Sequence, residues 1–351
     1  MKLGLIGLPQ SGKTALFEIL TSQPPPVSGR PENRMGTARI LDGRLDQLVE
    51  LYRPKKITPA TLEVVDPATP FPPLGPRVRG ADVDPYGPLR AADALALVVR
   101  VFENEAVPHP LASIDPVRDL AKAEEELTLT DLVQIESRLE KMERLEKIGR
   151  KAETGAERPV LERLGEWLEG GQPLRSMSWS ADEQRALRGY SFLSRLPLVV
   201  VFNLGEGTPP ALPSPPPGAV AVSLPARAEC EVVRLPEGER AGFRELFQIS
   251  ESGLETLLRA AQEALDLLSF FTAGPPEVRA WHLRRGSRAV DAAGKIHTDL
   301  ARGFVRAEVM THEQLLAAGS WSAGRERGWL RTEGRDYEVK DGDVLVILHT
   351  S

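Results

Sequence analysis

The segment Gly7–Thr14 has the residue types and spacing of a phosphate-binding loop. It reads GLPQSGKT, which fits G-x-x-x-x-G-K-[ST], between a short apolar run and a segment with a helical pattern. Such a loop curls so that backbone N–H groups and the N-terminus of the next helix point at phosphate oxygens. We expect Lys13 to reach the β and γ phosphates of a nucleotide and Thr14 to bind Mg²⁺. The expected phosphate contacts are Gly7, Pro9, Gln10, Ser11, Gly12, Lys13, Thr14 and Ala15.

Two further polar positions follow apolar runs and could complete a nucleotide site. Asp66 comes directly after Thr61–Val65, where a carboxylate could join the Mg²⁺ shell through water. The alternative is an aspartate that only caps the following turn. Asn203 comes directly after Leu198–Phe202, and its amide could bridge the phosphate loop and the edge of a base, because an amide both donates and accepts hydrogen bonds.

The hydrophobic pattern predicts the elements that position these residues. A helix is expected from Lys13 onward. Short apolar runs separated by loops or helical patterns predict an α/β fold with a doubly wound, largely parallel sheet. The predicted strands are Lys2–Ile6, Thr61–Val65, Ala94–Val101, Leu198–Phe202 and Ala219–Ser223.

A helical hairpin is expected to be inserted into this sheet domain. Between Asp119 and Ala152, apolar residues recur every three or four positions among charged ones, which predicts a long amphipathic helix. A returning helix is expected over 160–168, ending at Gly170. The charged faces of the hairpin could be an ordinary solvated surface or an arm that binds a partner.

The remaining pattern predicts two further helices and a small β-rich module. The helices are expected over Asp182–Ser194 and Leu254–Leu268, and a domain boundary is expected at Ala273–Pro276. The expected strands of the module are Val278–Leu283, Phe304–Val309 and Asp343–Leu348. The predicted domains are 1–118 with 176–270 for nucleotide binding, 119–175 for the helical insertion, and 271–351 for the module.

Composition excludes several classes of protein. A chain of 351 residues predicts two or three domains, and its net charge of −6 does not suit a protein that coats nucleic acid. The single cysteine, Cys230, excludes an intramolecular disulfide, and five scattered histidines do not favour a metal centre. No apolar run approaches the roughly 18 to 20 residues of a membrane span, and the run Leu3–Leu8 lacks a signal-peptide pattern. We therefore expect a cytoplasmic protein.

Several segments resemble the Obg-like ATPase (YchF) family of P-loop GTPases, and the likeness extends along nearly the whole chain. Gly7–Thr14 is similar to the GLPNVGKS of the family, and matching segments occur at 271–281 (FTAGPPEVRAW), 293–299 (AGKIHTD) and 302–309 (RGFVRAEV). The resemblance implies a GTPase-like domain, a helical coiled-coil insertion and a C-terminal TGS domain of the β-grasp type. It also implies a monomer.

The resemblance also bears on the choice of base. In the family, Asn-x-x-Glu replaces the guanine-reading Asn-Lys-x-Asp, and this chain has NLGE at 203–206. Because of the altered spacing and the longer Glu side chain, the carboxylate recognises the N–H donors of guanine less well. This change favours ATP over GTP. Ser223 lies near the family's last base-contacting segment, although the following Leu-Pro-Ala departs from it. The expected base contacts are Asn203, Leu204, Glu206 and Ser223.

Three departures from the family affect the nucleotide-sensing segments. The family's Asp-x-Ala-Gly is Asp66–Thr69 here, so the glycine that senses the γ-phosphate is lost, and Arg30 stands where the family has the first-switch Thr. Gln10 replaces the Asn of the phosphate loop. We expect binding to survive and nucleotide-driven switching to be blunted. No residue is suggested as a catalytic base, because the water-positioning region is the 70–73 stretch PFPP.

The C-terminal module carries a basic stretch. Residues 279–306 hold seven basic and two acidic side chains, which suits phosphate backbones, with Trp281, His282, His297 and Phe304 as candidates for stacking. The alternative is ordinary solvated arginines, with Trp281 and Phe304 in the core. The candidate RNA contacts are Arg279, Arg284, Arg285, Arg288, Arg302 and Arg306.

Three hypotheses follow for the function. The first is an ATP-preferring or GTP-using hydrolase, dependent on Mg²⁺, that regulates translation by binding the ribosome or RNA. The second, motivated by Arg30 and Thr69, is a nucleotide-binding scaffold with weak or no hydrolysis. The third is a small-molecule kinase that uses the same loop, for which no acceptor site is visible.

Overall fold

The computed structural model describes residues 1–25, 32–69, 71, 86–147, 157–205, 211–246, 249 and 252–350. Their contacts divide the chain into two compact units. The first unit comprises Met1–Ala38 and Glu63–Ala264, and the second comprises Arg39–Leu62 and Leu265–Ser351.

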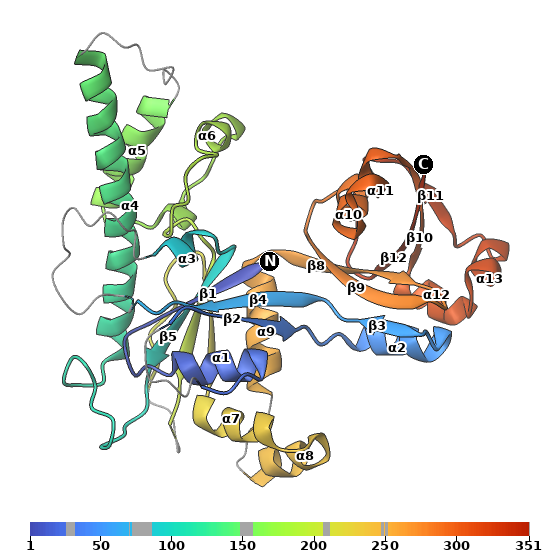
Figure 1. The fold of residues 1–351 in the computed structure, drawn as a ribbon, viewed down its shortest axis with the longest axis horizontal. Helices are drawn as coiled ribbons and strands as arrows, with labels where there is room; N and C mark the ends of the chain where they lie inside the picture. Colours follow the sequence, from blue (N-terminus) through green and yellow to red (C-terminus); the bar gives the residue numbers. More distant parts are fainter. Residues whose placement is uncertain are drawn as a thin grey trace. The chain divides into compact units, whose positions relative to one another are not determined.

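A six-stranded sheet forms the centre of the first unit (Figure 1). Its order is β2-β4-β1-β5-β6-β7, and β4, β1, β5, β6 and β7 pair with their neighbours in parallel. The strands are β1 (Lys2–Ile6), β2 (Arg34–Arg39), β4 (Thr61–Asp66), β5 (Ala94–Arg100), β6 (Leu198–Asn203) and β7 (Ala219–Leu224). The five predicted strands are therefore confirmed, and β2 is an edge strand that the apolar pattern did not reveal.

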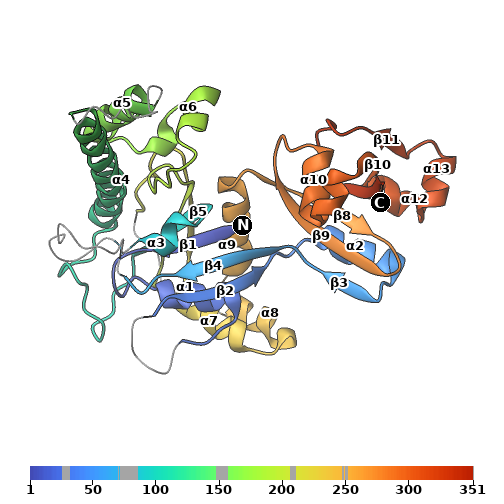
Figure 2. The same ribbon diagram turned by 45° about the horizontal axis from the view of Figure 1, so that its top comes forward.

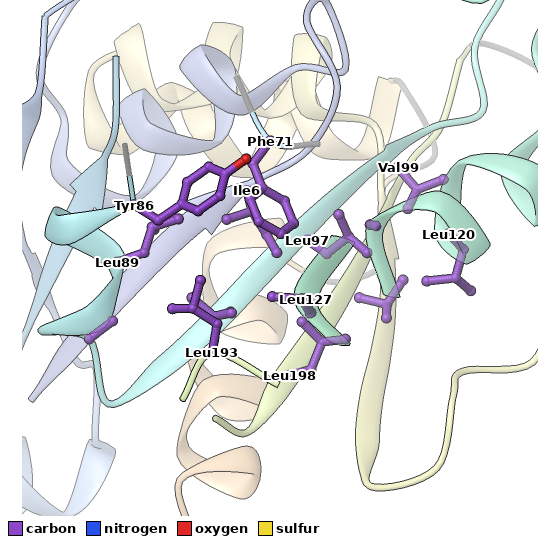
Figure 3. Packing of buried hydrophobic residues seen from close by; sticks show 14 of the residues in the cluster. Ile6, Phe71, Tyr86, Leu89, Leu97, Val99, Leu120, Leu127, Leu193 and Leu198 are labelled. Carbon is purple, nitrogen blue, oxygen red and sulfur yellow. The ribbon is translucent and has the colours of Figure 1, made fainter. Parts of the chain in front are cut away.

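Helices cover both faces of this sheet, as in a doubly wound fold. One face packs on α3 (Gly87–Arg90) and α4 (Pro116–Lys147), and Figure 3 shows its buried cluster, with Ile6, Leu97 and Leu198 facing Leu89 and Leu127. The other face packs on α1 (Lys13–Thr21) and α9 (Gly253–Ala264), which also contact α7 (Ala226–Arg234). Helix α8 (Glu237–Leu246) follows α7. Because parallel strands end at one edge, this arrangement gathers the residues after β1, β4 and β6.

The helical hairpin is present, and it has a small core of its own. Helix α4 runs beside α5 (Glu157–Glu169), and the two are seen together in Figures 1 and 2. Their apolar faces join residues of the short helix η1 (Leu174–Ser176) and of the segments before and after α6 (Ala181–Ala186). Buried members include Ile135, Met142, Leu161, Leu164, Leu174, Leu187 and Phe192.

The second unit is a separate six-stranded sheet with helices. Its order is β11-β10-β12-β8-β9-β3, and the strands are β3 (Lys56–Thr58), β8 (Leu267–Ala273), β9 (Glu277–Arg284), β10 (Phe304–Thr311), β11 (Arg331–Glu333) and β12 (Asp343–His349). Its helices are α2 (Gly43–Tyr52), α10 (Ala289–Ile296), α11 (Thr298–Arg302), α12 (His312–Ala318) and α13 (Trp321–Glu326).

The segment Arg39–Leu62 differs from the predicted domain division. The sequence boundaries place it with the nucleotide-binding domain, but α2 packs on β8 and β9, and β3 pairs in parallel with β9. Arg44 of α2 also donates to the Asp341 carboxylate at 2.8 Å. The connection between the neighbouring strands β2 and β4 is therefore built into the second unit.

Three predicted boundaries differ from the structure. The helix expected to run to Leu268 ends at Ala264, because Leu267–Ala273 forms the strand β8, which pairs antiparallel with β9. The helix expected over Asp182–Ser194 is only Ala181–Ala186. The boundary expected at Ala273–Pro276 lies in the turn between β8 and β9, where the Gly274 N–H donates to the Glu277 carbonyl at 3.2 Å.

Candidate functional site

The phosphate loop lies between β1 and α1, as the motif predicts. The Lys13 ammonium reaches back over the loop and donates to the carbonyl oxygens of Gly7 at 2.6 Å and Leu8 at 2.8 Å. The Ser11 N–H donates to the Leu8 carbonyl at 3.2 Å, which tightens the turn. Helix α1 begins at Lys13, so its unpaired N–H groups are available at this end. The loop can therefore direct an ammonium group and backbone donors at one anion.

The two glycines of the motif are required by geometry. Gly7 has φ +144°, and a side chain there would meet the Val98 carbonyl oxygen at 2.5 Å. Gly12 has φ +107°, and its Cβ would overlap the amide of Asn203. Gln10 also takes a left-handed conformation, with φ 63°, which is uncommon for a residue with a side chain. Backbone shape is therefore specified at three positions of the loop.

Asn203 fastens the phosphate loop to the start of α7. Its amide donates to the Ser11 carbonyl at 2.9 Å, and its side-chain oxygen accepts from the Ala226 N–H at 3.1 Å. The residue is 4% exposed, so both bonds are shielded from water. The structure thus places Asn203 against the loop, as its proposed bridging role requires, and adds Ala226, which the sequence did not suggest.

Asp66 lies at the end of β4 among positive charges. It is 8% exposed, and burial raises the pKa of its carboxyl, an effect opposed by Lys13 and Arg34. Burial likewise lowers the pKa of Lys13 to about 8, and the charge of Asp66 opposes that shift. Arg34 Nη1 lies 4.0 Å from Asp66 Oδ2. The charges of Lys13 and Asp66 therefore act on each other, and Arg34 adds a guanidinium that sequence reasoning missed.

The oxygen donors at this point suit Mg²⁺, which prefers hard oxygen ligands and retains several waters. Thr14 is exposed in the first turn of α1, and the charge of Lys13 acts on the Asp66 carboxylate at the end of β4. These two side chains could hold the metal, Thr14 directly and Asp66 through water. Among the described residues, no group of three or more His, Cys, Asp or Glu forms another candidate metal site.

Hydrogen bonds hold the segment Asp66–Thr69 and Phe71, where nucleotide sensing is expected, to neighbouring parts of the first unit. The Ala68 N–H, within Asp66–Thr69, donates to Asn33 Oδ1 at 2.9 Å. Further on, the Gly7 N–H donates to the Phe71 carbonyl at 2.9 Å, and the Phe71 ring is buried against Tyr86 with ring centres 5.0 Å apart. Phe71 is visible within the core in Figure 3. These contacts fix the chain on both sides of Thr69.

Other predicted contacts are placed less directly. Leu204 donates its N–H to the Leu224 carbonyl at 3.0 Å beside Asn203, and Ser223 is an exposed residue of β7. Glu206, Arg30 and the prolines at 70, 72 and 73 lie outside the described residues. The base-reading role of Leu204, Glu206 and Ser223 stays a prediction.

A small cavity beside the phosphate loop contains a histidine that the sequence did not suggest. The cavity, of about 10 Å³, is lined by Ser11, Arg100, His109 and Asp119 together with apolar neighbours. His109 Nε2 lies 2.9 Å from Asp119 Oδ2, and its Nδ1 accepts from the Leu111 N–H at 3.2 Å. Both ring nitrogens therefore have partners within this segment. His109 and Asp119 are ten positions apart in the sequence and far from the phosphate loop in it, so their position beside the loop is visible only in the folded structure.

Ser11 offers a stability prediction, because its buried hydroxyl makes no hydrogen bond within the described part of the chain. Ser11→Val removes this unpaired group and fills the cavity. We expect the melting temperature to rise by about 2 to 4 °C, corresponding to roughly 1 kcal/mol. Ser11→Ala, which leaves the space empty, should give a smaller rise in the same thermal-unfolding measurement. A lower melting temperature for Ser11→Val would contradict this interpretation.

The basic residues of the second unit are partly neutralised. Arg285, Arg288 and Arg302 lie near Asp266, Asp336 and Asp299, at 3.4, 2.7 and 3.8 Å respectively. Arg279 stacks on Trp281, while Arg284 and Arg306 are exposed.

Most of the expected stacking platforms are inside the core. Trp281, His282 and Phe304 are all buried, which leaves His297 exposed. The prediction that these three side chains could stack on bases is therefore wrong, and the alternative that Trp281 and Phe304 belong to the core of the module is confirmed.

Known proteins resemble the chain over almost its full length. The sequence model YchF-GTPase_C, described as a protein of unknown function (DUF933), matches residues 267–349. The ribosome-binding ATPase YchF of Escherichia coli O157:H7 is 34% identical over 365 residues, covering 99% of this chain and 98% of the relative. Obg-like ATPase 1 of Homo sapiens is 31% identical over 369 residues, covering 98% and 91%.

Solved structures agree with this relationship. The YchF GTPase of Schizosaccharomyces pombe matches with a TM-score of 0.78 and 26% identity, covering 99% of this chain and 97% of that one. A GTP-binding protein of Pyrococcus horikoshii OT3 shares the fold, with a TM-score of 0.60, 18% identity and full coverage of both chains. Both the loop geometry and the sequence identity lead to one assignment: the chain belongs to the family of YchF and Obg-like ATPases.

Proposed function

We propose that this chain binds a purine nucleoside triphosphate, with ATP preferred over GTP, hydrolyses its β–γ bond with Mg²⁺, and acts at the ribosome. The carrying observation is the phosphate loop, in which Lys13, the N-terminus of α1 and the Asn203 amide converge. Relatives at 31–34% identity include proteins named ribosome-binding ATPase and Obg-like ATPase, which supports the same activity here.

Hydrolysis would depend on positively charged and N–H groups already positioned around the phosphates, rather than on a side chain that acts as a base. On binding, the Lys13 ammonium would exchange the Gly7 and Leu8 carbonyls for phosphate oxygens. Thr14, and Asp66 through water, would hold Mg²⁺, which would supply charge neutralisation at the phosphates. The N–H groups of the loop and of α1 stabilise charge that develops on the leaving phosphate oxygens. His109 is not poised as a base in this arrangement, because both of its ring nitrogens have partners.

The deciding experiment is calorimetric titration with ATP, GTP and their non-hydrolysable analogues in the presence of Mg²⁺, followed by phosphate release on the same sample. Tighter binding of ATP with release above background is the expected result. Tighter binding of GTP would refute the base preference, and absence of binding would refute the proposed function.

A nucleotide-binding scaffold with weak or no hydrolysis is the second candidate. The bonds from Ala68 to Asn33 and from Gly7 to Phe71 favour it, because they fix the segment that would respond to the γ-phosphate. Binding without phosphate release in the same experiment would select this function, whereas turnover well above background would eliminate it.

The ribosome proposal predicts a role for exposed arginines of the second unit. The double variant Arg302→Glu with Arg306→Glu reverses two charges, and we expect it to bind ribosomes at least about tenfold more weakly, with a shallower dependence on salt. Co-sedimentation with purified ribosomes over a salt series measures both quantities. The double variant Arg185→Glu with Arg188→Glu, at two exposed positions of the first unit, is the matched control and should bind like the wild type. Equal loss in both proteins would refute a specific role for the second unit.

A further inference from the structure

Arg34 is a largely but not fully buried cation beside Asp66, at the expected metal site. Its side chain is 11% exposed, and its guanidinium carbon lies 4.0 Å from the centre of the Phe17 ring. Its Nη2 donates to the Pro24 carbonyl at 3.0 Å and, more weakly, to the Gln23 carbonyl at 3.4 Å. The guanidinium is thus held by α1 and by the chain that leaves it, and is not a freely moving surface group.

One nitrogen of this guanidinium is left without a hydrogen-bond partner. Nη1 is buried and makes no hydrogen bond within the described residues, although it lies 4.0 Å from Asp66 Oδ2. A buried donor without a partner is costly, and arginine keeps its charge at any physiological pH. Nη1 is therefore suited to bind an anion at this point, either the Asp66 carboxylate or a phosphate oxygen.

Asp66 is consequently shared between two cations, since both Lys13 and Arg34 act on its carboxylate. When a triphosphate binds, Lys13 is drawn to the phosphates, and Arg34 remains as the charged neighbour of Asp66. A guanidinium in this place repels a divalent cation and competes for the carboxylate that would hold the water shell of that cation. It also adds a permanent positive charge near the phosphates.

We propose that Arg34 takes over part of the role of Mg²⁺ in this chain, so that nucleotide affinity depends only weakly on the metal. This inference rests on the proposed nucleotide binding and concerns one specificity-determining residue of that site.

The test measures the dissociation constant of a non-hydrolysable ATP analogue by calorimetry, in Mg²⁺ and in EDTA. The ratio of the two constants reports the contribution of the metal and needs no turnover. We expect a ratio below about ten for the wild type and at least about tenfold larger for Arg34→Gln, which removes the charge. Arg34→Lys, which restores the charge, should return the ratio toward the wild-type value. Arg39→Gln makes the same change of charge at an exposed position of the same strand and should leave the ratio unaltered.

The possible outcomes distinguish failure of this inference from failure of the proposed nucleotide binding. A wild-type ratio above about ten, or equal ratios for the wild type and Arg34→Gln, overturns the inference while nucleotide binding stands. An increase of equal size in Arg39→Gln also overturns it, because net charge alone would then explain the effect. Failure of the wild type to bind in either condition refutes the proposed function and this inference together. Because the wild-type ratio is informative alone, the test does not depend on the folding of a variant.

Discussion

Lys13→Ala should abolish detectable phosphate release and weaken binding of ATP by about a hundredfold. Removal of one group that stabilises a transition state typically costs about 10² to 10³ in rate. Here the lost group is a desolvated ammonium that already lies over the loop, within hydrogen-bond distance of two of its carbonyls. Phosphate release under saturating ATP, together with titration calorimetry, measures the two effects separately.

Lys2→Ala is the matched control for Lys13. Lys2 begins β1, at the opposite end of that strand from the phosphate loop, where its ammonium lies 3.8 Å from the Glu63 carboxylate. We expect this variant to bind and release phosphate like the wild type. Ordinary turnover by Lys13→Ala would mean that the phosphate loop is not the site of the reaction.

Asn203→Ala should lower the free energy of unfolding by about 2 to 4 kcal/mol and weaken nucleotide binding at least tenfold. The substitution leaves the Ser11 carbonyl and the Ala226 N–H buried without partners, and each such group costs about 1 to 3 kcal/mol. The phosphate loop would also lose its connection to the start of α7. Chemical denaturation and calorimetry of the same preparation measure the two losses.

Two variants distinguish this connection from a general effect of losing an asparagine. Asn203→Asp keeps an acceptor for the Ala226 N–H but loses the donor to the Ser11 carbonyl, so it should weaken nucleotide binding more than its stability loss suggests. Asn104→Ala removes only a local bond, from the Ala106 N–H at 3.0 Å, and should change unfolding by less than about 1 kcal/mol. An unaltered stability of Asn203→Ala would contradict the bridging role.

The phosphate loop and the central strands were predictable because their signals are local. Gly7, Gly12 and Lys13 stand at fixed spacing in one short segment, and the strands are nearly continuous apolar runs. The central strands β5 and β6 are buried on both faces, so they appear as continuous apolar runs that can be recognised without knowing which face points to the core. Fold class and loop position followed directly.

The remaining parts depend on contacts between distant segments. Arg34 meets Asp66, and Phe71 pairs with Gly7, across lengths of chain that no periodicity connects. Leu267 and Leu268 continue the apolar spacing of α9, so the pattern could not show that pairing with β9 ends the helix before them. Local patterns locate elements, whereas their ends and partners are decided by tertiary packing.

The insertion of Arg39–Leu62 into the second unit also constrains the order of folding. A ribosome releases this segment roughly 200 residues before Leu265 begins the rest of its sheet, a delay of about 10 to 40 s at ordinary elongation rates. During that time Leu45 and Leu48, which are buried in the finished protein, have no strands to cover them. A fragment that stops at Ala264 would keep this exposure permanently, so a soluble nucleotide-binding domain requires Arg39–Leu62 to be replaced by a short polar turn.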